Sequence, residues 1–308
     1  IGLGIPAEPL FRSRDQEADF IKHLAPAFHN AGITTKIYVF DHNFNYDDNS
    51  EETDYPVQIY KALSPTMLGY DLVKGCAWHD YGGNYSEMND IQAKAPDMEQ
   101  IFTETSIGSW NDGRNLRKRL VNDFNRLLIH LINRYGRATM VWNFMLDLNY
   151  GPYTAASGSC TTCMGAIDID QRNYKTLSYN SHYYLICHAA EVIQSGAYRI
   201  GNSISATQEG LLYSTFLNTD GTYSLLLSNS SSTEYIIGIR TQADAPVTQI
   251  KLPARSVVSV KIGAEEHALH THLLNNADLC PFCMQNSEYY ANRALADNTI
   301  KISSADEL

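Results

Sequence analysis

The stretch Ile101-Phe102-Thr103-Glu104-Thr105-Ser106 decides how the first half of this chain is interpreted. Its aromatic and β-branched residues predict a buried β-strand that ends on a carboxylate and breaks at Gly108 and Trp110. In a strand–helix repeat, the side chains that carry chemistry gather at the carboxyl ends of the strands. Glu104 is therefore the first candidate for a catalytic residue.

A second strand-like run, residues 1–9, ends in the same way on a carboxylate, Glu8. Two carboxylic acids at the carboxyl ends of barrel strands are the pair with which many glycosidases cut a sugar–oxygen bond, one as nucleophile and one as proton donor. Hydrolysis of a glycosidic bond is the reaction that this pair favours.

From residue 1 to about 150, short apolar runs alternate with longer amphipathic runs. This alternation indicates βα units around a parallel sheet. The predicted strands are 2–5, 35–40, 75–79, 100–103 and 139–142, and the predicted helices are 15–31 and 115–135.

Five strands with their helices amount to little more than half of an eight-stranded barrel. A half-closed barrel leaves unpaired strand edges and an open side of its core. We therefore interpret residues 1–165 as the second half of a (β/α)8 barrel, strands 4 to 8, and expect the amino-terminal half to lie upstream of Ile1.

The character of the sequence changes after Pro152, where a glycine-rich loop runs through Gly165. An amphipathic helix is predicted at 179–193, and apolar residues then alternate with polar ones in runs separated by turn residues. Residues 166–262 are therefore predicted to form an antiparallel β-sandwich with its linking helix. Residues 263–308 are polar and without a sustained period, and we interpret them as an appendage of unknown role.

Bulk composition limits the classes of partner. The chain has 308 residues, is 44% hydrophobic and carries a formal net charge of -11. A negative average field disfavours nucleic acids and anionic membranes, so a neutral or polar substrate is expected. The sequence contains no apolar run long enough to span a bilayer and no signal-peptide pattern at its start.

Four of the six cysteines form two Cys-x-x-Cys pairs, Cys160 with Cys163 and Cys280 with Cys283. Such a pair can be a local disulfide, half of a zinc site or a redox dithiol. Loop-forming residues surround the first pair, which favours a disulfide or two plain thiols. Near the second pair a disulfide or free thiols are favoured over zinc, although three histidines precede it: His267, His270 and His272. No metal and no cofactor is expected.

Over residues 1–262 the chain resembles glycoside hydrolase family 30, which includes glucosylceramidases and β-1,6-glucanases. The resemblance rests on motifs in order: Ala7-Glu8-Pro9-Leu10 with Ala18-Asp19-Phe20; Ile37-Tyr38-Val39-Phe40-Asp41-His42; Ala77-Trp78-His79-Asp80-Tyr81; Phe102-Thr103-Glu104-Thr105; Val141-Trp142-Asn143-Phe144; and Tyr183-Tyr184 with Gly196-Ala197-Tyr198-Arg199-Ile200.

This resemblance implies a retaining mechanism in which Glu104 is the nucleophile and Glu8 the acid/base, with the two carboxyl groups roughly 5 to 5.5 Å apart. Glu8 then needs a raised pKa to keep its proton near neutral pH. The resemblance also implies a set of residues that hold the sugar: Asp41, His42, His79, Tyr81, Trp142 and Asn143.

One departure from the family pattern keeps an alternative open. Ala7 stands where the family has an asparagine that hydrogen-bonds the sugar. The first hypothesis is therefore a retaining glycosidase of β-glucosides, and the alternative is a catalytically impaired fragment or a carbohydrate-binding or scaffold protein.

Between glucosylceramide and β-1,6-glucan, the loop 158–165 with its Cys-x-x-Cys resembles the bacterial glucanase branch and favours the glucan. An extracellular, periplasmic or lysosome-like location is expected for such an enzyme.

Overall fold

The computed structural model describes residues 13–44, 54–154, 158–201, 207–241 and 247–263, together with the backbone of 271–273 and 299–304. The chain forms two compact units. Unit 1 comprises residues 1–107 and 130–165, and unit 2 comprises residues 108–129 and 166–308. The described part contains no helix that is both long enough and apolar enough to cross a bilayer.

The centre of unit 1 is a parallel sheet in the order β1-β2-β3-β5. Its strands are β1 (Ile37–Asn43), β2 (Val73–His79), β3 (Glu99–Glu104) and β5 (Gly136–Thr139). The order in the sheet follows the order in the sequence, as is common for successive βα units. The predicted parallel α/β organisation is confirmed for these strands, and the expected strand 2–5 lies outside the described residues.

The last of these strands begins earlier than its apolar residues predicted. The prediction was 139–142, whereas β5 ends at Thr139. The backbone N–H groups of Met140 and Trp142 still donate to the carbonyl oxygens of Phe102 and Thr105, at 2.8 and 2.7 Å. Asn143 then takes a left-handed conformation, with φ 73°. The apolar run therefore crosses the end of β3 as irregular backbone instead of extending the strand.

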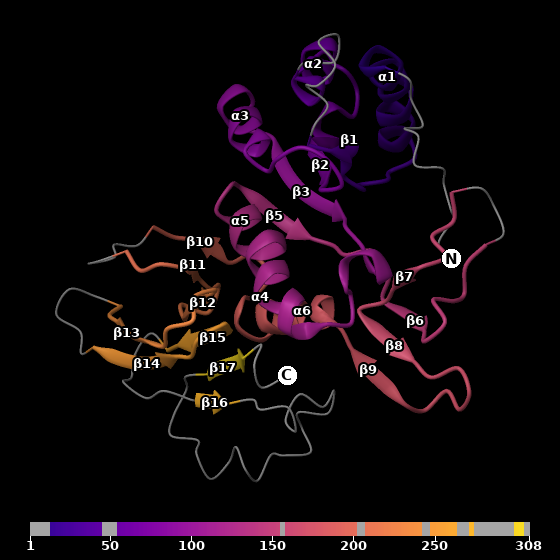
Figure 1. Cartoon of the computed structure of the whole chain (residues 1–308). Helices are drawn as coiled ribbons and strands as arrows, with labels where there is room; N and C mark the ends of the chain where they lie inside the picture. Colours follow the sequence, from indigo (N-terminus) through magenta and orange to yellow (C-terminus); the bar gives the residue numbers. More distant parts are fainter. Residues whose placement is uncertain are drawn as a thin grey trace. The chain divides into compact units, whose positions relative to one another are not determined.

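Helices α1 (Arg14–Asn30), α2 (Tyr55–Ala62) and α3 (Glu87–Lys94) belong to unit 1. Ser13 caps α1 by accepting the N–H of Gln16. Helices α1 and α2 pack on each other, and both contact β1 (Figure 1). The shorter helices α2 and α3 were not predicted. The remaining short elements are η2 (Tyr70–Leu72), β4 (Ile107–Gly108), η3 (Ser109–Asn111), α5 (His130–Ile132), β6 (Met145–Asp147) and β7 (Cys163–Met164).

Ion pairs gather around Glu99, the first residue of β3, at the amino-terminal end of the unit 1 sheet. Its carboxylate lies 3.0 Å from the Nζ of Lys36 and 3.1 Å from the guanidinium of Arg137, and it accepts the hydroxyl of Tyr38 at 2.5 Å. These groups connect the starts of β1, β3 and β5.

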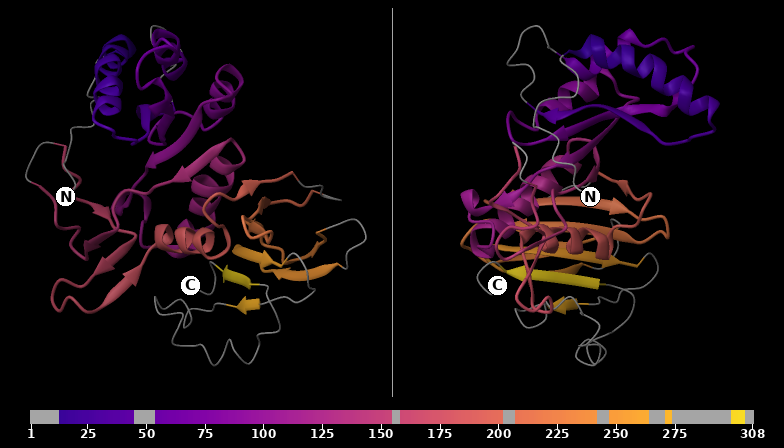
Figure 2. Two further views of the ribbon diagram at one scale, coloured as in Figure 1. Left: turned by 180° about the vertical axis from the view of Figure 1, so that it is seen from behind. Right: turned by 90° about the vertical axis from the view of Figure 1, so that its right-hand side faces the viewer.

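Unit 2 contains a six-stranded sheet in the order β10-β11-β12-β15-β17-β16. Its strands lie side by side in the right-hand view of Figure 2, where β17 is yellow. The bounds are β10 (Tyr198–Arg199), β11 (Leu211–Leu217), β12 (Tyr223–Asn229), β15 (Ser256–Ile262), β16 (Thr271–Leu273) and β17 (Thr299–Ser304). Segment 263–308, which showed no period in the sequence, thus supplies two strands of the sheet.

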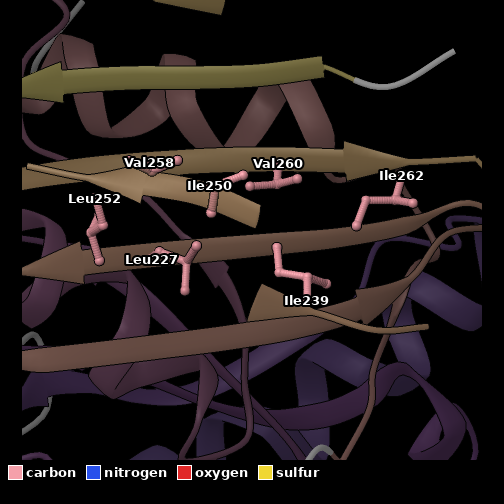
Figure 3. Packing of buried hydrophobic residues seen from close by; sticks show 7 residues of the cluster. All are labelled: Leu227, Ile239, Ile250, Leu252, Val258, Val260 and Ile262. Atoms are coloured by element: carbon pink, nitrogen blue, oxygen red, sulfur yellow. The ribbon is translucent and has the colours of Figure 1, made fainter. Parts of the chain in front are cut away.

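One face of this sheet is covered by the hairpin β13 (Tyr235–Ile239) and β14 (Thr248–Leu252). Between sheet and hairpin lies a purely apolar core, drawn in Figure 3. Alternate residues of β12 and β15 point into it, as the period-two pattern predicted. Its buried members are Leu227, Ile239, Ile250, Leu252, Val258, Val260 and Ile262.

The opposite face of the sheet contacts α4 (Leu116–Phe124), the π-helical η4 (Asn125–Ile129) and α6 (Ser181–Val192). Here two serines of the sheet meet polar side chains of the helical segments. His188 Nδ1 lies 2.7 Å from the hydroxyl of Ser259, and Ser228 bonds to Asn125. The predicted helix 115–135 is confirmed as an unbroken helical run over 116–132, in which α4 and the π-helical η4 belong to unit 2 and α5 belongs to unit 1.

A short hairpin, β8 (Ile167–Ile169) and β9 (Leu177–Tyr179), precedes α6 in unit 2. Buried Asp168 accepts from the guanidinium of Arg114 at 2.7 Å and from the amide of Asn180 at 3.1 Å. The sequence analysis missed this hairpin, because three-residue strands are too short to establish a period.

Candidate active site

Three neighbouring strands of unit 1 end on polar residues that stand in one row. The register pairs Asn43 at the end of β1 with His79 at the end of β2, and His79 with Glu104 at the end of β3. Because the strands are parallel, these ends meet at the same edge of the sheet. The edge carries an amide, an imidazole and a carboxylate side by side.

The row is brought into register by an irregularity on each side of β2. On β1 the register shifts between Phe40 and His42, so that Asp41 is the extra residue. On β3 the shift falls between Phe102 and Glu104 and makes Thr103 the extra residue. Bulges of this kind redirect side chains at the ends of sheets and next to active sites.

The two extra residues meet each other. The Thr103 hydroxyl donates to Asp41 Oδ1 at 2.6 Å, and His79 Nε2 lies 3.0 Å from the same oxygen. Burial raises the pKa of Asp41, but the hydrogen bonds from His79 and Thr103 and the two nearby imidazoles outweigh it, so its pKa lies below the ordinary value. Asp41 is therefore an anion that joins all three strand ends.

His42 lies against His79, with ring centroids 6.2 Å apart and planes 27° from parallel. Burial lowers the pKa of His42, and the charge of His79 lowers it further. Its Nδ1 accepts the backbone N–H of Asn43 at 2.6 Å. A neutral His42 must then carry its proton on Nε2, so it can donate one hydrogen bond to a ligand.

Glu104 is held by Tyr81 from the loop that follows β2. The Tyr81 hydroxyl lies 3.2 Å from Glu104 Oε1 and 3.0 Å from the hydroxyl of Ser106. A phenol has a single proton, so when Tyr81 donates to the carboxylate, Ser106 must donate to Tyr81. Burial raises the pKa of Tyr81, and the charge of Glu104 adds to the rise, so the phenol stays protonated.

The loop that carries Tyr81 is attached to the row itself, because the Tyr81 backbone N–H donates to Asn43 Oδ1 at 3.1 Å. Tyr81 nevertheless keeps half of its surface exposed. A fully buried ring would serve mainly to pack the core. The half-exposed Tyr81 instead orients the Glu104 carboxylate and leaves it accessible to a ligand.

Trp142 and Asn143 follow β5. The Trp142 N–H donates to the carbonyl of Thr105, one residue beyond Glu104. Asn143 is left-handed, and the next residue, Phe144, is 70% exposed. The structure thus anchors the backbone of this pair at the end of β3.

Of the residues predicted for the site, the structure brings Asp41, His42, His79, Tyr81 and Glu104 into one hydrogen-bonded or ring-contacting group. Glu8 and the adjacent Ala7 lie outside the described residues, so the separation of the two carboxyl groups stays a prediction.

The sequence analysis did not assign site roles to Asn43, Thr103 and Ser106. Each lies within two residues of an assigned one, and that adjacency at a strand end was the available signal.

The first Cys-x-x-Cys pair is a disulfide between Cys160 and Cys163, one of the alternatives that the loop composition favoured. Within the described ranges, no three His, Cys, Asp or Glu side chains are placed to hold a metal ion. The second pair, Cys280 with Cys283, and the preceding His267 and His270 fall outside those ranges.

The chain is similar to members of one family of known proteins. Residues 196–260 match the model of the glycosyl hydrolase family 30 β-sandwich domain. The endo-1,6-β-D-glucanase BGN16.3 of Trichoderma harzianum is 24% identical over 237 residues, which are 74% of this chain and 43% of the relative. The endo-1,6-β-D-glucanase neg1 of Aspergillus fumigatus is 23% identical over 255 residues, 77% of this chain and 47% of the relative.

Among solved structures, the endo-β1,6-glucanase BT3312 superposes with a TM-score of 0.76 at 39% sequence identity, over 82% of this chain and 54% of that one. The chain thus spans about half the length of the relatives it matches. The resemblance to glycoside hydrolase family 30 is confirmed, and these relatives are glycoside hydrolases.

Proposed function

We propose that this chain carries both catalytic carboxyl groups of a retaining β-glycosidase that hydrolyses β-1,6-glucan. The observation that carries the proposal is Glu104 at the carboxyl end of β3, with the Tyr81 hydroxyl 3.2 Å from it and His79 beside it in register. The glucanase relatives support the substrate class.

In the proposed mechanism, the Glu104 carboxylate attacks the anomeric carbon while Glu8 protonates the leaving glycosidic oxygen. Water then attacks the glycosyl–enzyme ester, and Glu8 takes the proton from that water. Tyr81 orients the Glu104 carboxylate by its hydrogen bond. Asp41, His42, His79, Trp142 and Asn143 bind the sugar, through polar contacts and stacking of Trp142 on the apolar face of the ring.

The architecture belongs to the same proposal. We assign β1, β2, β3 and β5 to strands 5 to 8 of a (β/α)8 barrel and the run 2–5 to strand 4, with the antiparallel unit as its β-sandwich. A location outside the cytosol is supported by the Cys160–Cys163 disulfide, because cytosolic thiols are kept reduced.

Trapping with a 2-fluoro β-glucoside tests the nucleophile, using the full natural polypeptide that contains residues 1–308. Mass spectrometry of the digested protein is expected to find the sugar on the peptide with Glu104, and Glu104→Gln is expected to abolish the label. Glu99→Gln is the matched control, because Glu99 lies at the opposite end of the same strand. Labelling of another carboxylate, or none in an active preparation, contradicts the assignment.

Ala7 favours a second candidate, a carbohydrate-binding protein with impaired turnover. A missing hydrogen bond that tightens in the transition state costs about two orders of magnitude in rate. Ala7→Asn separates the candidates in the full natural polypeptide. A rise in glucan hydrolysis means that Ala7 limits turnover, whereas binding of β-1,6-glucan without hydrolysis in both variants supports the binding protein.

A further inference from the structure

Glu17 is a buried acid of unit 1 that the proposed mechanism does not use. It lies in the first turn of α1 with 8% of its surface exposed. Its Oε1 accepts the backbone N–H of Phe40 at 2.8 Å, and it also hydrogen-bonds to the side chain of Tyr55. A surface helix rarely turns a glutamate inward unless the carboxyl group satisfies a buried partner.

The backbone that Glu17 holds is strained. Phe40 and Asp41 are consecutive non-glycine residues with positive φ, 76° and 48°. Left-handed conformations are costly for residues with a Cβ and persist only where the surroundings impose them, which happens most often at functional sites. In this stretch the Phe40 ring is fixed against Tyr55 and Trp78, with centroids 5.0 and 5.4 Å away.

The strained pair of residues is also what places Asp41. Because the register of β1 shifts between Phe40 and His42, Asp41 leaves the regular ladder. Its carboxylate then reaches His79 and Thr103 on the two neighbouring strands. A regular β1 would instead alternate its side chains to the two faces of the sheet.

We infer that Glu17 is a positioning residue for the glycosidase site: by accepting the Phe40 N–H it maintains the left-handed turn that sets Asp41 against His79 and Thr103. This inference rests on the proposed function for its catalytic consequence, because Asp41 acts there as a sugar-binding residue. Glutamine keeps a side-chain oxygen that can accept the Phe40 N–H, so Glu17→Gln is the conservative variant.

Amide hydrogen exchange tests the structural step without any substrate. In the full natural polypeptide, Glu17→Ala is expected to speed exchange of the Phe40 amide about tenfold or more, since that N–H loses its acceptor. Glu17→Gln is expected to keep the protection. Tyr55→Phe is a milder variant that removes only the hydroxyl beside Glu17, and it should speed exchange partially. Unchanged protection in both Glu17→Ala and Tyr55→Phe overturns the inference.

Kinetics on β-1,6-glucan test the functional step. Glu17→Ala is expected to raise KM about tenfold with a smaller change in kcat, as loss of a binding group does. Glu17→Gln should restore KM. In an Asp41→Ala background, Glu17→Ala should add nothing, because residues that act through one another are not additive. Full additivity in this cycle, or an equal loss in Glu17→Gln, overturns the inference.

Asp19→Ala is the matched control. Asp19 is on the same helix, but its side chain is exposed and pairs with Lys22 at the surface. Neither exchange at Phe40 nor KM should change in this variant, and a change equal to that of Glu17→Ala would assign the effect to the helix as a whole. A parent protein without glucan hydrolysis defeats the proposed function, whereas the exchange experiment continues to test the role of Glu17.

Discussion

Polar side chains lie in opposite environments in the sheets of the two units. In unit 1, polar groups gather at one end of a parallel sheet, on bulged and left-handed backbone, and Tyr81 and Asp41 remain open to solvent. In unit 2, polar groups lie under helices, fully buried and bonded to one another, as His188 is to Ser259. Exposure and backbone strain, more than polarity, therefore distinguish a site that can act on a ligand from a polar contact that holds two layers together.

His182 at the start of α6 is an exception to this rule in unit 2. It is fully buried, and neither ring nitrogen has a hydrogen-bond partner among the described residues. Burial lowers its pKa to about 4, with the charges of Arg126 and Arg119 acting in the same direction and that of Asp123 against it.

The largest expected effect therefore concerns acid stability. The folded pKa of His182 lies below its unfolded value, so its contribution is complete above about pH 6.5 and is lost as pH falls toward 4, up to on the order of 3 kcal/mol. Thermal unfolding followed from pH 7 to pH 4 should show a smaller loss for His182→Leu than for the parent. If the melting temperatures of His182→Leu and the parent fell equally with pH, the His182 imidazole would not take up a proton on unfolding. Its burial would then not limit the acid stability of unit 2.

Tyr81→Phe sharpens the comparison on the side of unit 1. Removing the hydroxyl deletes one hydrogen bond to the charged Glu104, worth roughly 1.5 to 3 kcal/mol, so kcat should fall about 10- to 100-fold. The melting temperature should hardly change, because the ring is half exposed. Tyr198→Phe, at a residue of unit 2 that is 74% exposed, is the control and should alter neither quantity. A stability loss without a rate loss would make Tyr81 a structural residue.

Ser259→Ala makes the converse test in unit 2. It leaves His188 Nδ1 buried without this partner, which should lower the free energy of unfolding by about 1 to 2 kcal/mol. The kcat on glucan should stay at the parent value. Ser232→Ala, in the exposed loop after β12, is the matched control for loss of a hydroxyl. If kcat fell while the variant was still fully folded, the proposed distinction between the two units would be wrong.

The smallest effect is expected at the other end of the unit 1 sheet. Glu99→Gln weakens ion pairs with Lys36 and Arg137, whose side chains are 50% and 64% exposed, so solvent screening limits the loss to about 1 kcal/mol. Unfolding in denaturant should register that loss, and 1 M salt should shrink the difference from the parent. A large activity loss here would show that both ends of the sheet serve the reaction.

Patterns among neighbouring residues of the sequence predicted a large part of the observed fold. Helices α1 and α6 lie within two residues of their predicted bounds, and β11 to β15 lie in the segment 166–262 that was predicted to form antiparallel strands, because apolar periodicity is a property of neighbouring residues. The same patterns placed Glu104, His79 and Asp41 at strand ends. They could not place α2 and α3, whose eight residues give barely two helical turns of pattern.

By itself, the sequence determined the parallel class of the unit 1 sheet, the antiparallel pairing of the strands within residues 166–262, the strand-end carboxylate and the resemblance to a family. Only the tertiary structure decided that Asp41 and Thr103 leave their ladders and meet, that Glu17 turns inward to hold Phe40, and that the predicted helix 115–135 is divided between two units. The physical reason is that periodicity is a property of adjacent residues. A bulge or a left-handed turn instead depends on how strands and helices distant in the chain pair with one another.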